Sequence, residues 1–246
     1  KAMERNMIVF GVNAVIEALR SGQVRAVRVA TNGGRLAEVR RLATMQGVPV
    51  ARVAVEALDR VAGGAVHQGV AADVAASEPL GLEDLIGQAA DPALLLVLDG
   101  IEDPQNVGAI LRAGDAAGVD GVVRQTRRAA ALATVAKTSA GAVAHVKLAS
   151  VVNIARALTQ LQAAGIWTVG LAADGDDIYG DFDLTLPTAL VLGSEGQGLR
   201  RLVRERCDRV ASIPMCGRVN SLNVGVAAGV ALFEAVRQRQ RARRGE

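Results

Sequence analysis

The sequence contains few aromatic residues. Only three Phe, one Trp and one Tyr occur among its 246 residues. Proteins that bind single-stranded nucleic acid without sequence preference stack successive bases on aromatic side chains, so a binding platform of that kind is not expected. Hydrophobic residues nevertheless make up 50% of the chain. We therefore expect a sizeable core that is built mainly from aliphatic side chains.

Cysteine, histidine and long apolar runs are also scarce. Cys207 and Cys216 are too few for the disulfide framework of a small secreted domain, which favours a cytoplasmic protein. His67 and His145 lie far apart and near neither cysteine, so no metal-ligand spacing is present. No apolar run is long enough to cross a bilayer, and no signal peptide pattern is visible. We predict a cytoplasmic protein without a bound metal.

Charge is unevenly distributed along the chain. Residues 1–76 carry 10 basic and 6 acidic side chains, residues 77–196 carry 7 and 15, and residues 197–246 carry 11 and 4. Two basic segments around an acidic one are typical of a protein whose ends face a polyanion. Solvated helix faces with a disordered basic tail would give the same pattern, so charge alone leaves both interpretations open.

Hydrophobic periodicity predicts a small α/β domain at residues 7–76, followed by a linker at residues 77–92. No element is predicted before Gly11. The predicted helices are 11–20, 36–45 and 56–62, and the predicted strands are 26–30, 48–53 and 69–74. Within the linker, a short helix is predicted at 82–89.

A second domain is predicted at residues 93–246. Leu94–Leu98 is a continuous apolar run, as expected for a strand that is buried on both faces. Strand and helix patterns then alternate, which indicates βαβ crossovers and a mostly parallel sheet. The helices are predicted at 106–117, 132–143, 153–164 and 199–207, and the strands at 121–123, 146–148, 166–171, 189–192 and 210–213. A last helix is predicted from about Ser221, with Ser221 as its N-cap.

Three polar segments follow predicted strands and are candidates for chemistry. In the first, Arg112 could bind a phosphate, or it could form a salt bridge with Asp103 or Asp115. The second, LVLGSEGQGL, holds Glu195 among three glycines, but its spacing differs from the dinucleotide fingerprint G-x-G-x-x-G.

The third segment leads into the last predicted helix. Here Met215 could form the wall of an adenine site, and Ser221 and Asn223 could face the same cleft from the start of the helix. The plainer interpretation makes Ser221 only an N-cap and Asn223 a surface amide.

Taken together, the segments resemble a known family. DPQNVGAILRA, LVLGSEGQGLRRL and IPMCGRVNSLNVGVAAGVALFEA resemble the three motifs of the SpoU (TrmH) family of RNA ribose 2′-O-methyltransferases. This resemblance covers about Leu94 to Arg237. FGVNAVIEAL and HQGVAADV near the N-terminus resemble the small substrate-binding domain of many members.

The resemblance implies a trefoil-knotted α/β domain that binds S-adenosylmethionine, a homodimer, and a small N-terminal RNA-binding domain. It points to a guanosine ribose in large-subunit (23S) rRNA as the methyl acceptor. Carried over by position, it implies catalytic roles for Arg112, Asn106, Glu195, Ser221 and Asn223. Cofactor contacts are expected from Gly193, Ile213 and Leu222 together with Met215, and RNA contacts from Arg35, Arg40, Arg41 and Arg127.

Some positions depart from the family pattern. Gly225 stands where a serine is common, and Ala144 where an acidic residue is frequent. Gln125, Thr126 and Arg128 replace most of an expected Lys-Asp-Arg-Ser run, which bears on the identity of the RNA. Two alternatives are kept: a tRNA ribose methyltransferase of the same family and a non-catalytic RNA-binding assembly factor, although the intact set of Asn106, Arg112, Glu195 and Asn223 argues against the second. A dinucleotide-dependent dehydrogenase is disfavoured because its glycine fingerprint is absent.

Overall fold

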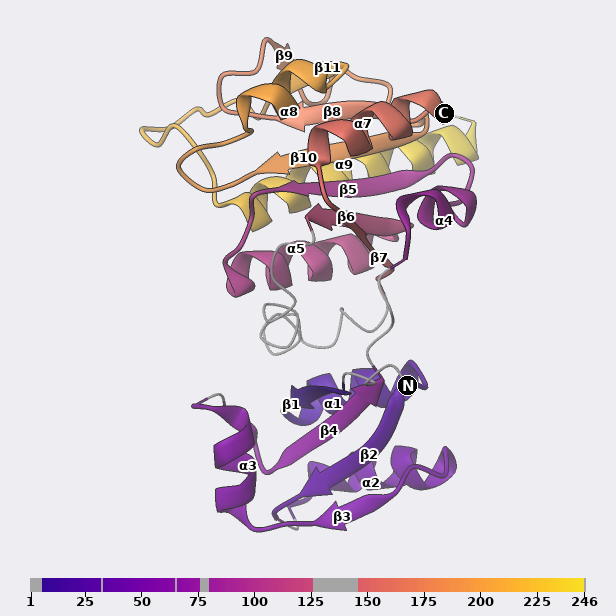
Figure 1. The fold of residues 1–246 in the computed structure, drawn as a ribbon, viewed down its shortest axis with the longest axis vertical. Helices are drawn as coiled ribbons and strands as arrows, with labels where there is room; N and C mark the ends of the chain where they lie inside the picture. The colour runs from indigo at the N-terminus through magenta and orange to yellow at the C-terminus, as the bar shows by residue number, and fades with distance from the viewer. Residues whose placement is uncertain (1–5, 32, 65, 76–79, 126–145, 246) are drawn as a thin grey trace. The chain divides into compact units, whose positions relative to one another are not determined.

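The computed structural model describes residues 6–31, 33–64, 66–75, 80–125 and 146–245 (Figure 1). These residues fall into two compact units that divide between residues 75 and 80. Each unit has its own sheet.

The first unit is a four-stranded sheet with helices on both faces. Its elements are β1 (Asn6–Phe10), α1 (Val12–Arg20), β2 (Val24–Val29), α2 (Leu36–Met45), β3 (Val50–Arg52), α3 (Val55–Ala62) and β4 (Val70–Ala75). The strand order is β1-β4-β2-β3, and β4 is antiparallel to both of its neighbours. Helices α1 and α2 bury Leu19 and Val39 against one face, while Leu58 of α3 packs with Phe10 and Ala71. Strand β1 was not predicted, because its pairing partner β4 lies some sixty residues along the chain.

The second unit contains a seven-stranded sheet in which every recorded strand pair is parallel. Its strand order is β7-β6-β5-β10-β8-β11-β9. The elements are α4 (Leu82–Gly87), β5 (Leu94–Asp99), α5 (Pro104–Ala117), β6 (Gly121–Gln125), β7 (Leu148–Val151), α7 (Ile154–Ala163), β8 (Trp167–Leu171), β9 (Asp177–Ile178), β10 (Thr188–Gly193), α8 (Arg201–Arg206), β11 (Arg209–Ser212) and α9 (Val224–Arg244). The predicted helix at 132–143 lies outside the described residues.

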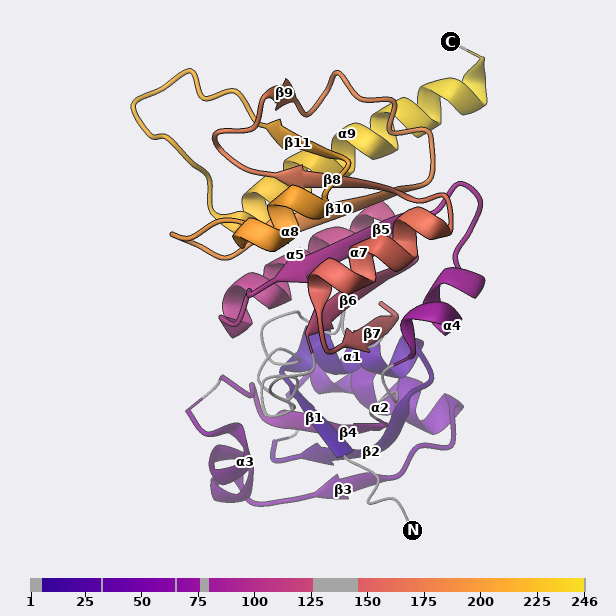
Figure 2. The same ribbon diagram turned by 45° about the horizontal axis from the view of Figure 1, so that its top comes forward.

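Helices cover both faces of this sheet. Figure 2 shows α7 and α8 on one face and α5 and α9 on the other. The central strands β5 and β10 are buried at every position, as the apolar run Leu94–Leu98 predicted. Part of the predicted linker packs into this unit: Leu82 and Leu85 of α4 are buried in its core, and Leu80 forms a bridge with Ala149.

The basic end of α9 is fastened to the sheet. The guanidinium of Arg239 donates hydrogen bonds to the backbone carbonyls of Pro92, Ala93, Leu184 and Leu186, at donor–acceptor distances of 2.7–3.0 Å. These carbonyls lie at or just before the amino ends of β5 and β10. The helix continues to Arg244, so this segment is not the disordered basic tail that the charge pattern allowed.

Candidate functional site

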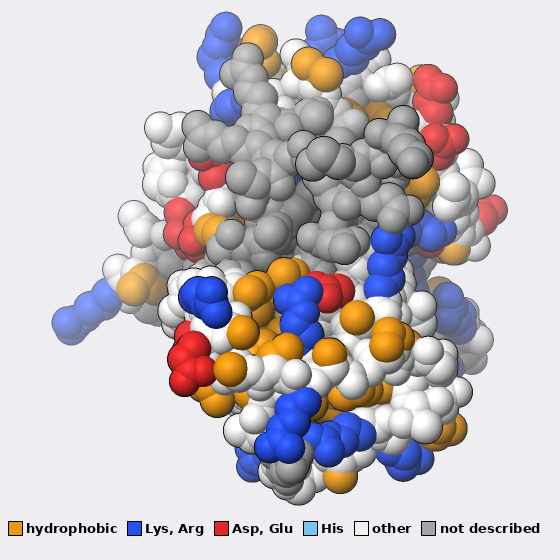
Figure 3. Space-filling view, turned by 60° about the horizontal axis from the view of Figure 1, so that its bottom comes forward, with side chains coloured by type: hydrophobic (Ala, Val, Ile, Leu, Met, Phe, Trp, Pro, Cys, Tyr) orange, Lys and Arg blue, Asp and Glu red, His pale blue; other side chains and the backbone are white. Residues whose placement is uncertain are grey.

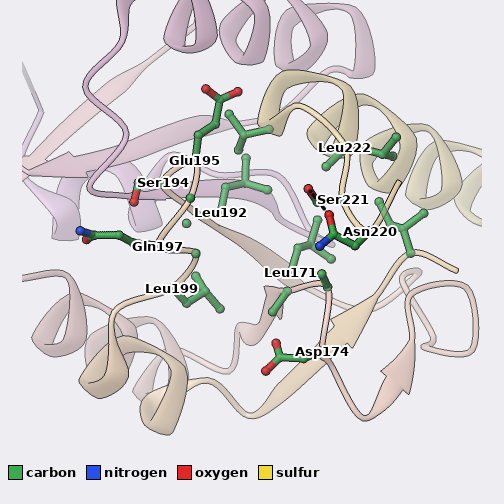
Figure 4. A pocket seen from close by; sticks show the side chains of 18 of the residues that line it. Leu171, Asp174, Leu192, Ser194, Glu195, Gln197, Leu199, Asn220, Ser221 and Leu222 are labelled. Carbon is green, nitrogen blue, oxygen red and sulfur yellow. Dashed lines mark hydrogen bonds between the residues drawn. The ribbon is translucent and has the colours of Figure 1, made fainter. Parts of the chain in front are cut away.

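A cleft of about 840 Å³ opens at the carboxyl ends of β8, β10 and β11. Its volume is within the range of about 300–1,000 Å³ that is usual for small-molecule sites. Figure 4 shows side chains from several segments that are distant in sequence around this cleft. The lining residues are 171–174, 192–199, Arg201, Arg204, Ala211, Ile213, Met215, 220–224 and Ala227.

The loop after β10 packs its own backbone closely against the end of that strand at the cleft wall. Ser194 and Gly198 exchange backbone hydrogen bonds of 3.1 and 2.8 Å, and Gly196 and Gly198 have φ values of +83° and +65°. A Cβ atom at Gly193 would lie 2.1 Å from the carbonyl carbon of Gly198 and 2.3 Å from the nitrogen of Leu199. Only glycine fits at position 193, because backbone atoms cannot yield as a flexible side chain can.

An ion pair between a buried carboxylate and a half-exposed guanidinium anchors the end of this loop. The Asp99 side chain is fully buried at the last position of β5, opposite Gly193 of β10. It accepts hydrogen bonds from the backbone N–H of Arg200 at 2.7 Å and from the Arg200 guanidinium at 2.5 Å. A buried carboxylate requires such pairing. Sequence reasoning did not identify this pair, and the only available signal was a charged residue at the end of an otherwise apolar strand.

Asn223 is the N-cap of α9, so the prediction for Ser221 was wrong. The Asn223 Oδ1 accepts hydrogen bonds from the backbone N–H groups of Gly225 at 2.9 Å and Val226 at 3.3 Å. The hydroxyl of Ser221 instead contacts Asn220 Oδ1 at 3.5 Å. Asparagine and serine cap helices comparably well, so residue preference does not favour position 221 over position 223.

The amide group of Asn223 also binds two other predicted site residues. Its Nδ2 donates to Asn106 Oδ1 at 2.9 Å and to Glu195 Oε1 at 2.6 Å. Asn106 is buried in the first turn of α5, and its backbone N–H donates to the capping carboxylate of Asp103. One residue from each motif therefore meets at a single amide. Because Oδ1 caps the helix while Nδ2 faces the two acceptors, the orientation of this amide is fixed.

Helices α5 and α9 approach closely beside this cluster. A Cβ atom at Gly225 would lie 2.9 Å from Ala109 Cβ and 3.2 Å from Asn223 Oδ1. Gly225, which stands where the family often has serine, is thus buried at the contact between α5 and α9.

The four predicted cofactor residues, Gly193, Ile213, Met215 and Leu222, all line the cleft, as does Ser221. Arg112 does not line it. Its side chain is exposed on α5 and has no hydrogen bond or ion pair recorded to any described residue. The salt bridge considered for Arg112 is therefore not observed in the described part of the chain.

The arginines predicted to bind RNA in the first unit differ in their surroundings. Arg35 and Arg41 are exposed, and Arg41 lies 3.9 Å from the sulfur of Met45. The guanidinium of Arg40 donates to the carbonyl of Thr31 at 3.3 Å, which ties it to the loop before α2. Arg127 lies outside the described residues.

The residues that the structure describes do not support a metal site, Cys207 as a nucleophile or a membrane-spanning helix. No group of three or more His, Cys, Asp and Glu side chains there could hold a metal ion. Burial raises the pKa of the Cys207 thiol to about 12, so this group stays protonated and is a poor nucleophile. Among the described helices, none has both the length and the apolar character required to cross a bilayer.

Comparison with known proteins places these features in context. Residues 93–233 match the SpoU rRNA Methylase family, and residues 8–80 match a domain described as RNA 2′-O ribose methyltransferase substrate binding. The chain is 48% identical to the 23S rRNA (guanosine-2′-O-)-methyltransferase RlmB of Xylella fastidiosa, with 96% of this chain and 98% of the relative covered. It is 43% identical to the putative TrmH family tRNA/rRNA methyltransferase YacO of Bacillus subtilis, with 94% and 95% covered. The SpoU methyltransferase AviRb from Streptomyces viridochromogenes, solved in complex with AdoMet, has a similar structure, with a TM-score of 0.79, 28% identity, and 96% of this chain and 91% of that chain covered.

Proposed function

The chain belongs to the SpoU rRNA Methylase family, and we propose that it transfers a methyl group from S-adenosylmethionine to the ribose 2′-hydroxyl of a guanosine in 23S rRNA. The observation that carries this proposal is the 48% identity to an RlmB enzyme over 96% of this chain and 98% of the relative. Identity at this level over both units supports the same substrate class. This function also places the protein in the cytoplasm, where bacterial rRNA is found.

S-adenosylmethionine fits the cleft. Gly193 lines the cleft where the backbone of Gly198 and Leu199 packs against it, and Ile213, Met215 and Leu222 supply apolar surface for an adenine. When bound, the cofactor supplies an electrophilic sulfonium methyl group. The protein's own contribution is then to place the ribose hydroxyl in line with that methyl, which in the best intramolecular cases lowers a barrier by about 7–11 kcal/mol.

We assign the placement of the target nucleotide to the cluster around Asn223. Asn106 and Glu195 are held by the Asn223 amide, and each keeps acceptor capacity for a sugar or base edge. Arg112 would bind the phosphate beside the target ribose and stabilise charge that develops on O2′. Because a guanidinium remains protonated in proteins, Arg112 does not act as the base. The O2′ proton leaves to a phosphate oxygen or to water as the new O–CH₃ bond forms and the S–CH₃ bond breaks, with S-adenosylhomocysteine as the leaving group.

A methylation assay tests this function. The wild-type chain, incubated with methyl-labelled S-adenosylmethionine, should label 23S rRNA that lacks the modification at one alkali-resistant position. Total tRNA serves as the competing substrate. Label in tRNA alone would support ribose methylation but contradict the assignment to rRNA. No label in either RNA, despite cofactor binding, would favour an assembly factor.

We propose that the first unit binds folded rRNA through phosphate contacts from Arg35 and Arg41. On the face drawn in Figure 3, the Lys and Arg side chains of the described residues lie in separate groups. Replacing both arginines by glutamate should weaken RNA binding. The negative slope of log affinity against log salt concentration should become less steep by about 1–2, because each phosphate contact contributes about 0.7–0.9 to its magnitude. Affinity for the cofactor should not change. Arg60→Glu, at another exposed arginine of this unit, is the control, and an unchanged salt slope in the double variant would overturn the assignment.

We also propose that the chain has the trefoil knot and forms the homodimer that the family resemblance implies. Val226 and Phe233 of α9 are about half exposed, which supports a second copy packing on this helix. Sedimentation of the wild-type chain as a monomer would contradict the homodimer.

A further inference from the structure

The first unit has a cavity of its own. It measures about 420 Å³ and is formed by the amino ends of α1 and α2 together with the loop before β4. A volume of this size is usual for small-molecule sites. The function proposed above uses only Arg35 of the residues that line it, so the other polar side chains there have no assigned role. The lining residues are Val12, Asn13, Ile16, Gly34, Arg35, Glu38 and Gln68.

Gln68 is held in a defined orientation at this cavity. Its backbone φ is +52°, and no other non-glycine residue in the described part of the chain has a positive φ. Such a conformation is uncommon for a residue with a side chain. The Gln68 Oε1 accepts a hydrogen bond from the backbone N–H of Val12, the first residue of α1, at 2.9 Å. Because the oxygen is used in this way, the Nε2 of the amide is left to donate to a ligand.

Glu38 brings a carboxylate to the same cavity. Its Oε1 accepts a hydrogen bond from Arg20 at 3.0 Å, whereas its Oε2 has no hydrogen bond recorded to a described residue. The side chains of Asn13 and Arg35 likewise have no partner recorded among the described residues. The cavity therefore combines an unused carboxylate oxygen with two amides and a guanidinium that are available to a ligand.

This combination favours a nucleobase over a free anion. A carboxylate with an unused oxygen repels phosphate, but it can accept two N–H donors side by side. Guanine is the RNA base that offers two adjacent donors, N1–H and N2–H, on its Watson–Crick edge. Val12 and Ile16 supply apolar surface for the faces of the base. Sequence-specific RNA recognition usually targets unpaired bases, which leave the stack and form hydrogen bonds along such edges.

We propose that this cavity binds one unpaired guanine of the folded rRNA, an inference that rests on the proposed function. The Glu38 carboxylate accepts from N1–H and N2–H, and the Gln68 Nε2 and the Asn13 amide bond the acceptors of the base. Arg35 binds the phosphate of the same nucleotide. The first unit thus reads a base in addition to the RNA backbone, and this base contact helps to select the RNA.

Removing the charge of Glu38 distinguishes base recognition from simple electrostatics. Glu38→Gln deletes a negative charge from a surface that faces RNA, so electrostatics alone predicts unchanged or tighter binding. We expect the opposite: the full chain should bind unmodified 23S rRNA roughly tenfold more weakly, the effect of losing a bidentate base contact. The slope of log affinity against log salt concentration should not change, because no phosphate contact is lost. Glu56→Gln, at an exposed glutamate of α3 outside the cavity lining, is the matched control in the same filter-binding series.

Chemical footprinting identifies the bound base. Kethoxal reacts with N1 and N2 of unpaired guanines, the two positions assigned to Glu38. At saturating concentration the wild-type chain should protect one unpaired guanine of 23S rRNA that becomes reactive again with Glu38→Gln and with Asn13→Ala. The other protected positions should stay protected in both variants, and Glu56→Gln should give the wild-type pattern.

The possible failures can be told apart. Equal or tighter binding of 23S rRNA by Glu38→Gln, or kethoxal protection identical to wild type, would overturn the guanine site while wild-type methylation of 23S rRNA upheld the function. A wild-type chain that neither bound nor methylated 23S rRNA would overturn both. Misfolding does not explain the expected result, because the ion pair that Glu38→Gln removes joins two largely exposed side chains and contributes little to stability. Thermal unfolding and cofactor affinity of this variant should therefore match wild type.

Discussion

Replacing Arg112 by alanine should reduce methyl transfer by about 10²–10³-fold, the usual loss when a donor that stabilises developing negative charge is removed. Arg112 is exposed and lies outside the cleft lining, so cofactor affinity and thermal stability should remain close to wild type. Single-turnover methylation of 23S rRNA measures the effect on chemistry, and calorimetry with S-adenosylhomocysteine checks the cofactor site. Arg156→Ala, at an exposed arginine of α7, is the matched control.

The lysine variant distinguishes a guanidinium from a simple positive charge. Lysine keeps the charge but lacks the planar fork that binds a phosphate through two parallel hydrogen bonds. Arg112→Lys should therefore recover only part of the lost rate and bind RNA more weakly than wild type. Near-full turnover with unchanged RNA affinity would be inconsistent with the role assigned to Arg112.

The sequence predicted the elements of the sheet well where local pattern and burial agree. Leu94–Leu98 is a continuous apolar run, and the strand it predicted is buried at every position. The short strands β1 and β9 were missed, because β1 pairs with a strand some sixty residues away and β9 has only two residues. No local pattern encodes such pairings, since their stability depends on where the partner strand lies.

The site shows the same division. The resemblance and the strand ends predicted that Asn106, Glu195 and Asn223 would belong to one site, and in the structure the Asn223 amide donates hydrogen bonds to both Asn106 and Glu195. The pair of Asp99 and Arg200 spans 101 positions and could not be found from spacing. The hydrogen bond from Arg40 to the Thr31 carbonyl was equally invisible, because a basic helix face does not indicate which cations bind the chain itself.

Asn223 serves both the fold and the site, and two substitutions should separate these roles. Asn223→Ala removes the N-cap of α9, which typically lowers the free energy of unfolding by about 1 kcal/mol. It also releases Asn106 and Glu195, and a displacement of about 1 Å in a positioning group can cost about 10²-fold in rate. Asn223→Asp keeps an oxygen for the cap, so any loss of stability in thermal or denaturant unfolding should come from the contacts with Asn106 and Glu195 and not from the cap.

In the aspartate variant, however, a carboxylate replaces the amide nitrogen that lies 2.6 Å from Glu195 Oε1. Two like charges at this distance repel, and Asn106 loses its donor as well. We therefore expect Asn223→Asp to lose about 10²-fold in methyl transfer although the cap of α9 is retained, the magnitude expected for a misplaced positioning group. Ser221→Ala should leave the unfolding transition unchanged, because the Ser221 hydroxyl does not cap the helix. A stable Asn223→Asp variant with wild-type activity would mean that the contacts of Asn223 with Asn106 and Glu195 have no part in methyl transfer, whereas loss of stability in Ser221→Ala would contradict the capping that the structure shows.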